Sequence, residues 1–488
     1  MRGPSMGSDY ENKDNSNYQL QFDGYSQMDP SSTMNSYSQS PNMKNFFQTE
    51  FSNSKQSKSR ADWFHAQGYA ARKRGDFVNA IDFYSKALEL NGQHFKALFN
   101  RGFAYDKIGE YDMAIRDYSR ALDIDPKNAY AYYNRGISLD RKGDFDAAIE
   151  NFTQAIDLEP NKADFYHNRG FAFRKKKAFD KAITDYAKAI MIDGKHFKAF
   201  YNRAFCYDKI GNQRAAETDY LDALELQPNN INALHHLGTL REKMGGDRLQ
   251  LAMDNFNQVV SLDESYAPSF NGRGLVWDRM NQYNEALKDF SKAIELDSAN
   301  AVYWHNRACC LRNMGWYDRA IEDFNKAVEL DPRNPIIYSN RGLVWRKLER
   351  YDKAVIDYGN EIKYGNRNLK SFNNRAYCHA KMSNYKEAIY DYSKVLEMDN
   401  TNIHALHNRG ISYERLGKYV NAIADFSLVL QIDPNNANAY FNRGCCYDSI
   451  GELDLAISDY SIALELDMKL GNGNSTGNGS TNLSTAIQ

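Results

Sequence analysis

The sequence predicts an all-α protein built from about twelve stacked helical hairpins. The first observation is a fixed period, because an arginine recurs every 34 residues from Arg101 to Arg135 and onward. The second is a Gly or Ala after each arginine slot, an alanine twelve residues further on (fourteen in one repeat) and an aromatic residue four beyond that. Alanine and aromatic side chains four apart share one helix face, and the small residue lets a second helix approach closely. Units of this length stack because none can bury its apolar face alone.

The array divides into segments by its composition. Residues 1–60 are rich in Ser, Asn and Gln, and Leu20 is their only Leu, Ile or Val, so this tail is predicted to be disordered. Repeats one to five span 61–230. An atypical sixth repeat, 231–266, has a two-residue insertion and Leu237 in the arginine slot. Repeats seven to twelve span 267–468, and the Gly-, Asn- and Ser-rich segment 469–488 is predicted to be a flexible tail.

The repeats resemble tetratricopeptide repeats. The shared features are the period of 34, the Gly, Ala and aromatic positions, prolines such as Pro126 after second helices, and a tyrosine three residues after the glycine, as in Tyr105. The resemblance implies a right-handed α-solenoid, or superhelix, whose first helices line a concave groove. In ten repeats the family's usual leucine before the small residue is an arginine, which gives an Asn-Arg-Gly or Asn-Arg-Ala signature.

The recurrent arginine has a partner within each repeat. Nine of the ten arginine-bearing repeats have an aspartate sixteen residues later, the third repeat has Asn151, and the two repeats without the arginine lack the aspartate as well. This correlated loss predicts structural ion pairs, with ligand binding by the arginines as the alternative. The pairs that represent this prediction are Arg101 with Asp117, Arg169 with Asp185, Arg203 with Asp219, and Arg307 with Asp323.

An asparagine precedes the arginine in nine repeats. The resemblance places it on the concave groove, similar to the asparagine ladders in the superhelical repeats of O-GlcNAc transferase. A row of amides can bond the backbone of an extended peptide, and the alternative is that each amide bonds only neighbouring helix backbone or water. Nearby aromatic residues such as Phe103, Phe171 and Tyr377 are candidates to grip apolar peptide side chains. The predicted peptide-binding row is Asn100, Asn134, Asn168, Asn202, Asn306, Asn340, Asn374, Asn408 and Asn442.

These features predict a scaffold or adaptor that binds extended segments of other proteins, not an enzyme. No catalytic residues, cofactor or metal site are expected, since His404 and His407 lack a third ligand and no phosphate loop or zinc signature is present. One alternative is a co-chaperone of heat-shock chaperones. Lys96, Lys198 and Lys370 match one position of a carboxylate clamp, but the other clamp residues are absent. The other alternative is a regulatory subunit of a peptide-modifying enzyme.

The charge balance argues against nucleic acid as a partner. The chain has 61 basic and 63 acidic side chains and a formal net charge of −2, with the signs interleaved along the repeats. Without a long apolar run or a secretory signal, we expect no membrane insertion and a cytoplasmic location, with nuclear or ciliary locations left open. The end of the last repeat exposes apolar residues, which predicts self-association through the C-terminal end. The sequence names neither the partner proteins nor the pathway.

Overall fold

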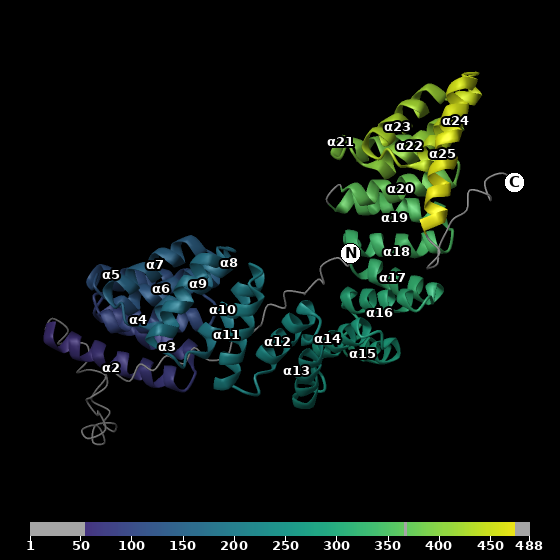
Figure 1. Ribbon diagram of the computed structural model, residues 1–488. Coiled ribbons are helices and arrows are strands. Elements are labelled where there is room, and N and C mark those ends of the chain that lie inside the picture. The colour runs from purple at the N-terminus through teal and green to yellow at the C-terminus, as the bar shows by residue number, and fades with distance from the viewer. Residues whose placement is uncertain (1–53, 366–367, 474–488) are drawn as a thin grey trace. The chain divides into compact units, whose positions relative to one another are not determined.

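The structure is a computed structural model that describes residues 54–365 and 368–473. Every helix or strand assigned in these ranges is an α-helix, and the helices follow one another as twelve hairpins (Figure 1). The predicted all-α array of hairpins is therefore confirmed. The hairpins form two compact units, residues 54–264 and 265–473, called here the first stack and the second stack. Most of the two predicted tails lies outside the described residues, and the proposed division within the array stays a prediction.

Each stack contains six hairpins. The helices of the first stack are α2 (Ser54–Lys73), α3 (Phe77–Leu90), α4 (Phe95–Lys107), α5 (Tyr111–Ile124), α6 (Ala129–Lys142), α7 (Phe145–Leu158), α8 (Ala163–Lys175), α9 (Phe179–Ile192), α10 (Phe197–Lys209), α11 (Gln213–Leu226), α12 (Ile231–Met244) and α13 (Arg248–Leu262). Those of the second stack are α14 (Ala267–Arg279), α15 (Tyr283–Leu296), α16 (Ala301–Asn313), α17 (Tyr317–Leu330), α18 (Pro335–Lys347), α19 (Tyr351–Tyr364), α20 (Leu369–Lys381), α21 (Tyr385–Met398), α22 (Ile403–Arg415), α23 (Tyr419–Ile432), α24 (Ala437–Ser449) and α25 (Leu453–Gly473).

The two helices of a hairpin meet where the sequence pattern has its small residue and its aromatic residue. A Cβ atom added to Gly136 would lie 2.7 Å from Cε1 of Phe152, and one added to Gly274 would lie 2.7 Å from Cε1 of Phe290. Both rings are buried. Only a residue without a side chain lets the backbone of the first helix approach the ring this closely, so the ring packs directly against bare backbone.

Asparagines fix where many of the first helices begin. The side chain of Asn128 accepts a hydrogen bond from the backbone N–H of Ala131, and Asn402 does the same for Ala405. These residues are N-caps, which satisfy backbone donors that the first turn leaves unpaired. Between the two helices of the second hairpin, Gly109 adopts φ 86°, a left-handed conformation that ends the first helix.

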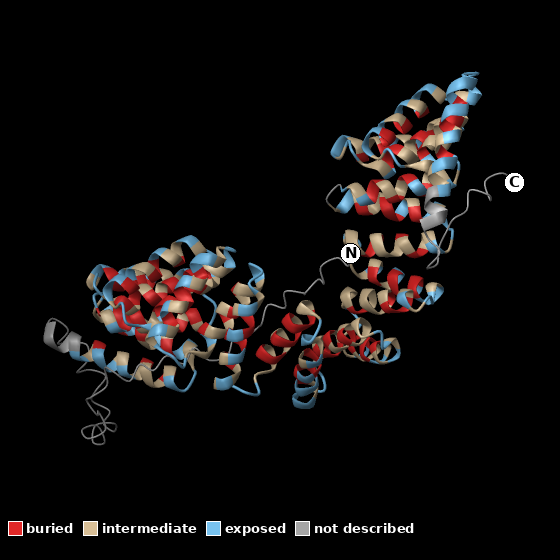
Figure 2. Ribbon diagram, in the orientation of Figure 1, coloured by how far each residue is buried: buried red, intermediate tan, exposed pale blue. Residues whose placement is uncertain are grey.

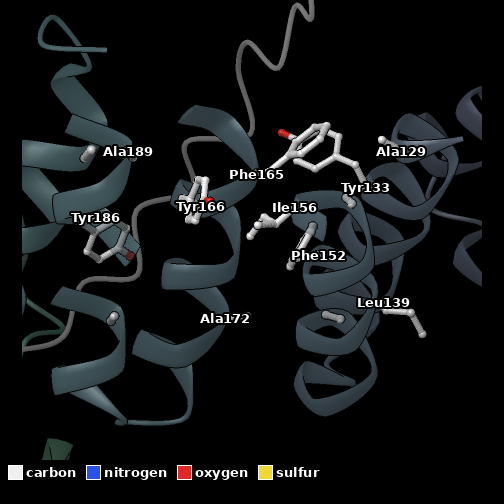
Figure 3. Close-up of a cluster of buried hydrophobic side chains, with 14 of the residues drawn as sticks. Ala129, Tyr133, Leu139, Phe152, Ile156, Phe165, Tyr166, Ala172, Tyr186 and Ala189 are labelled. Atoms are coloured by element: carbon white, nitrogen blue, oxygen red, sulfur yellow. The ribbon is translucent and has the colours of Figure 1, made fainter. Parts of the chain in front are cut away.

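Buried side chains form a band between the helices of each stack (Figure 2). The largest cluster of the first stack joins successive repeats rather than the two helices of one hairpin alone. There the rings of Tyr133 and Phe165, from α6 and α8, have centroids 4.6 Å apart, and Phe152 and Tyr166 lie nearby (Figure 3). Each hairpin thus completes the core of the one before it, as expected for a stacked array.

Two repeats are irregular at positions that the sequence marks. In the sixth, the insertion forms a turn in which Gly245 and Gly246 both have positive φ, and Leu237 fills the arginine slot as a fully buried side chain. In the ninth, Glu361 is buried in α19 where most other repeats have Ala or Val. Burial raises the pKa of Glu361, while contacts with Ser371 and Ser339 oppose that shift.

Candidate functional site

The first helices of successive repeats form a layer of their own within each stack. In the first stack α4 contacts α2 and α6, and in the second stack α22 contacts α20 and α24. The described residues show no comparable contacts between successive second helices. The layer whose helices touch one another has the smaller radius, so the first helices lie on the inner face of each stack. All nine asparagines of the predicted row are on these first helices.

Most of the recurrent arginines link three successive helices. In the second stack, Nε and Nη2 of Arg307 donate to the two carboxylate oxygens of Asp323 at 2.7 and 2.8 Å. Its third nitrogen, Nη1, donates to Oγ of Ser291 in the preceding repeat at 3.1 Å. We call this arrangement the Ser–Arg–Asp relay. The same two-pronged carboxylate contact joins Arg101 to Asp117, Arg169 to Asp185, Arg203 to Asp219, Arg273 to Asp289, Arg341 to Asp357, Arg375 to Asp391, Arg409 to Asp425 and Arg443 to Asp459.

The hydroxyl end of the relay was missed in the sequence. A Ser or Thr lies sixteen residues before several of the arginines and accepts from the guanidinium, as Ser85 does for Arg101 and Thr153 for Arg169. Where the hydroxyl is present, the relay therefore ties the hairpin to the repeat before it as well as closing the hairpin itself. Arg203 and Arg375 are preceded at this spacing by Ala187 and Gly359, which have no hydroxyl.

The sixth repeat restores part of the relay by a different route. Asn255 occupies the aspartate position of this repeat, and Leu237 has no polar group that could donate to it. Arg241, one helical turn later, instead donates through Nη1 to Oδ1 of Asn255 at 2.8 Å. Nε of Arg241 donates to Glu217 at 2.8 Å. The guanidinium is thus supplied from the next turn, which the sequence pattern did not reveal.

Most asparagines of the predicted row contact the repeat before them. We call the nine asparagines of this row rungs. In six of them, Nδ2 lies at hydrogen-bond distance from the residue thirty-five positions earlier, which belongs to the preceding first helix. These pairs are Asn100 with His65, Asn168 with Tyr133, Asn202 with His167, Asn306 with Asn271, Asn340 with His305, and Asn442 with His407. The amides of Asn134 and Asn408 instead donate to the backbone of their own helices, and Oδ1 of Asn374 accepts from Arg346.

The nine rungs differ in how far they are exposed. Asn134, Asn168, Asn202 and Asn374 are buried, with 4 to 8% of their surface exposed. Asn100, Asn306, Asn340, Asn408 and Asn442 are partly exposed. Three of the four rungs in the first stack are therefore enclosed between repeats, whereas four of the five in the second stack reach solvent.

Histidines accept the hydrogen bonds of two first-stack asparagines, Asn100 and Asn202. Because Nδ2 of Asn202 can only donate, Nε2 of His167 accepts, and the ring proton is on Nδ1. Burial lowers the pKa of His167 to about 3 and that of His65 to about 4. Both rings are therefore neutral near neutral pH, which keeps them as acceptors.

Cys309 lies beside a histidine in the second stack. Sγ of Cys309 lies 3.7 Å from Nε2 of His305, one turn earlier in α16. Burial opposes ionisation of this thiol, but His305 and Arg312 outweigh it and lower its pKa.

The described residues contain no group of three or more His, Cys, Asp or Glu side chains placed to hold a metal ion. In the same ranges, no helix combines the length and apolar character that a membrane crossing requires.

Comparison with known proteins gives the following matches. A chain described as a tetratricopeptide repeat protein from Parabacteroides merdae is 20% identical, over 51% of this chain and 98% of its own, with a TM-score of 0.46. YrrB, described as a TPR protein with an unusual peptide-binding site, is 25% identical over 36% of this chain and 91% of its own, with a TM-score of 0.34. Yeast Tom70 is 16% identical over 86% of this chain and 97% of its own, with a TM-score of 0.39. No curated protein matches this chain significantly.

Sequence profiles of the tetratricopeptide repeat match nine segments that together cover more than half of the chain. They are residues 95–128, 129–162, 163–196, 197–230, 267–300, 301–334, 369–402, 404–436 and 437–467. With the hairpin stacks and the inner layer of first helices, these matches establish that the chain belongs to the tetratricopeptide repeat family.

Proposed function

We propose that the protein is a non-catalytic scaffold or adaptor that holds an extended segment of another protein on the inner face of its repeats. The fold is one that typically serves protein interaction. The observation that carries the proposal is the row of amides in the second stack, which recur every 34 residues and of which four of the five are partly exposed. A peptide backbone presents donors and acceptors at regular intervals, so a regular row of amides suits it better than it suits any one side-chain sequence.

The contacts of the rungs support this role. In Asn408 and Asn442, the described contacts use Nδ2, which leaves the second N–H and the carbonyl oxygen of the amide for a ligand. Asn340 is less available, because its Oδ1 accepts from Arg312 at 2.7 Å. We therefore assign the main backbone contacts to Asn408 and Asn442. Asn306 is included as a third contact through the second N–H of its amide, because its Nδ2 donates to Asn271 and its Oδ1 lies 3.2 Å from Nδ1 of His305.

The test uses random-sequence peptides selected by display for binding to the full chain. Replacing Asn306, Asn408 and Asn442 together by Ala should weaken selected peptides about tenfold to a thousandfold, since each hydrogen bond contributes about 0.5–1.5 kcal/mol. The control is the pair Asn284→Ala and Asn421→Ala, exposed asparagines on second helices. Equal affinity of the wild type and the triple variant at matched melting temperature would reject the proposal that these asparagines bind the peptide.

Two further measurements separate the alternatives. Methylating the backbone nitrogens of a selected peptide should weaken it more than replacing its side chains by Ala, if the backbone is what is recognised. Amidating the C-terminal carboxylate should have no effect, whereas a clamp-type co-chaperone would lose its ligand. A regulatory subunit of a peptide-modifying enzyme would be recognised by turnover of the captured peptide in the presence of the catalytic partner.

We also propose self-association through the last helix, α25. Its side chains Leu453, Ile457 and Leu464 are 58%, 63% and 60% exposed and recur at helical spacing. Replacing all three by Ser should shift the sedimenting species to a smaller mass, while Ile356→Ser with Val420→Ser, equally exposed elsewhere, should not. An unchanged assembly state would contradict self-association through these residues. A cytoplasmic location remains part of the proposal, and imaging of a fluorescent fusion tests it.

A further inference from the structure

Two arginines of the first stack share one arrangement, in which the guanidinium lies beside two aromatic rings. The guanidinium of Arg72 lies 4.9 Å from the ring centroids of both Tyr69 and Phe103. Three repeats later, Arg174 lies 4.7 Å from the ring of Phe171 and 4.9 Å from that of Phe205. In each case one ring is on the helix of the arginine and the other on the next first helix. We call these the two arginine–aromatic stacks.

Neither guanidinium is paired with an acceptor in the described residues. Nε of Arg72 and Nε of Arg174 are both buried without a hydrogen-bond partner. Both side chains as a whole are only partly buried. The described ion pairs likewise include neither residue. By contrast, the arginines at the same repeat position in the second stack, Arg312 and Arg346, donate to Asn340 and Asn374.

The surroundings of each arginine–aromatic stack carry an excess of positive charge. Ammonium groups of Lys73 and Lys107 lie 5.1 and 5.2 Å from the rings of Tyr69 and Phe103. Those of Lys175 and Lys209 take the same places over Phe171 and Phe205, at 5.6 and 5.1 Å. The regularity shows that the same cationic group is built twice.

The nearby carboxylates are largely engaged elsewhere. Asp106 accepts from Ser138 and is paired with Arg141, and Asp208 is paired with Lys243. Asp140 is the exception, because its Oδ1 is buried without a hydrogen-bond partner, and Lys175, Arg141 and Arg174 are near enough to act against the rise in its pKa that burial causes. The guanidinium groups of Arg72 and Arg174 therefore have no hydrogen-bonded carboxylate among the described residues.

The geometry of a stacked guanidinium selects its ligand. Aromatic rings interact with the faces of the group, while its N–H bonds lie in its plane and point out at its edge. With Nε enclosed, the edge formed by Nη1 and Nη2 is the one left to bind a carboxylate with two parallel hydrogen bonds. The rings themselves are occupied by the arginines, so they are not free to stack on nucleic-acid bases.

We propose that the first stack binds an acidic protein segment, whose Asp or Glu carboxylates are held by Arg72 and Arg174. The proposal deepens the proposed function, because it also assumes an extended segment as the ligand, but it rests on different residues in the other stack. Since the two arginines are three repeats apart, a single segment that reaches both must be extended and must carry at least two acidic groups.

The experiment measures binding of a fluorescent oligoglutamate peptide to the full chain, with the oligoglutamine peptide of equal length as the neutral control. Wild type should bind the glutamate peptide at least tenfold more tightly than the glutamine peptide, and added salt should reduce the difference. Arg72→Met with Arg174→Met keeps much of the side-chain bulk and should abolish that preference. The matched control is Arg116→Met with Arg214→Met, which removes the same charge from exposed positions on second helices and should leave the preference intact.

Other outcomes are equally decisive. If the Met variant unfolds, Arg72→Lys with Arg174→Lys keeps the charge and loses the planar fork, so a loss of several-fold supports the proposal and unchanged affinity overturns it. Tighter arginine-dependent binding of a single-stranded RNA would overturn the acidic-peptide assignment. The triple asparagine variant should bind oligoglutamate as wild type does. If it alone weakens the glutamate peptide, the arginine inference fails while the asparagine row stands.

Discussion

The two stacks use one repeat position in opposite ways. In the second stack, Arg312 and Arg346 donate to asparagines of the next repeat, so the charge is satisfied within the protein. In the first stack, Arg72 and Arg174 stack between aromatic rings and have no described acceptor. The backbone is the same in both, so the neighbouring side chain decides whether an arginine stabilises the array or is offered to a ligand.

The two stacks also differ in their histidines, and of the expected changes, acidification should have the largest effect on stability. Burial lowers the pKa of His65 and His236 to about 4, and of His167 and His235 to about 3. All four are in the first stack. The unfolded chain takes up these protons first as the pH falls below 6.5, so stability is complete above that pH and is lost on acidification. At pH 5 each histidine should cost about 2 kcal/mol.

Hydrogen exchange at pH 7 and pH 5, corrected for intrinsic rates, measures this difference by region. Protection should fall more in the first stack than in the second, where burial lowers the pKa of His407 and the pKa of His305 is raised. His167→Gln should remove about one quarter of the pH effect, taking equal contributions from the four rings. Equal loss of protection in both stacks would contradict the assignment.

Loss of an arginine should be the next largest effect, and the two stacks supply a natural comparison. Arg307→Ala leaves the buried carboxylate of Asp323 unpaired and should cost about 3–5 kcal/mol. Arg135 donates instead to the neutral Asn151, so Arg135→Ala should cost only about 1–3 kcal/mol. Denaturant unfolding measures both, and additive effects of Arg307→Ala and Asp323→Ala in a double-mutant cycle would mean that the contact has no coupling energy.

A stabilising change should come from Asp140, next to the second arginine–aromatic stack. Burial raises its pKa to about 6, so its ionised form is unfavourable in the folded protein above that pH. Asp140→Asn should stabilise the first stack by about 2–3 kcal/mol at pH 7. The gain should shrink as the pH falls from 6 to 4, because the unfolded carboxyl group then becomes protonated as well. A gain that is constant with pH would point to packing instead.

The smallest expected effect concerns the turns. Non-glycine residues with positive φ are Lys177 in the first stack and Asn281, Glu349 and Ser383 in the second. Because glycine adopts this conformation without a steric cost, Glu349→Gly should stabilise the second stack by about 0.5–1 kcal/mol. Thermal unfolding checks this against Glu349→Ala, which keeps the strain and should give no gain.

The hairpins and the Arg–Asp contacts were accessible from the sequence because they lie within one repeat at a fixed spacing. The period places Arg307 and Asp323 on facing helices, and the correlated loss in two repeats points to their contact. The exposure of the asparagines was not accessible in this way. It depends on the residue thirty-five positions earlier, which comes close only when two repeats are stacked, as His167 does to Asn202.

The arginine–aromatic stacks were missed for the same reason. Phe103 and Phe171 were noticed as candidates to grip apolar groups, but the sequence gives no sign that Arg72 and Arg174 cover them. One ring comes from the helix of the arginine and the other from the next repeat. Such a site has no motif of its own, since it is created by the offset between neighbouring helices.

The Ser–Arg–Asp relay has a consequence for how such a chain lengthens or breaks. Because donor and acceptors recur at the same places, a gene duplication that copies one complete unit creates a junction already matched on both sides. Duplication of a segment of any other length would not create a matched junction. Arg203 and Arg375 follow Ala187 and Gly359 and so lack the hydroxyl anchor. Under mechanical pulling, these two junctions are where the array should first come apart.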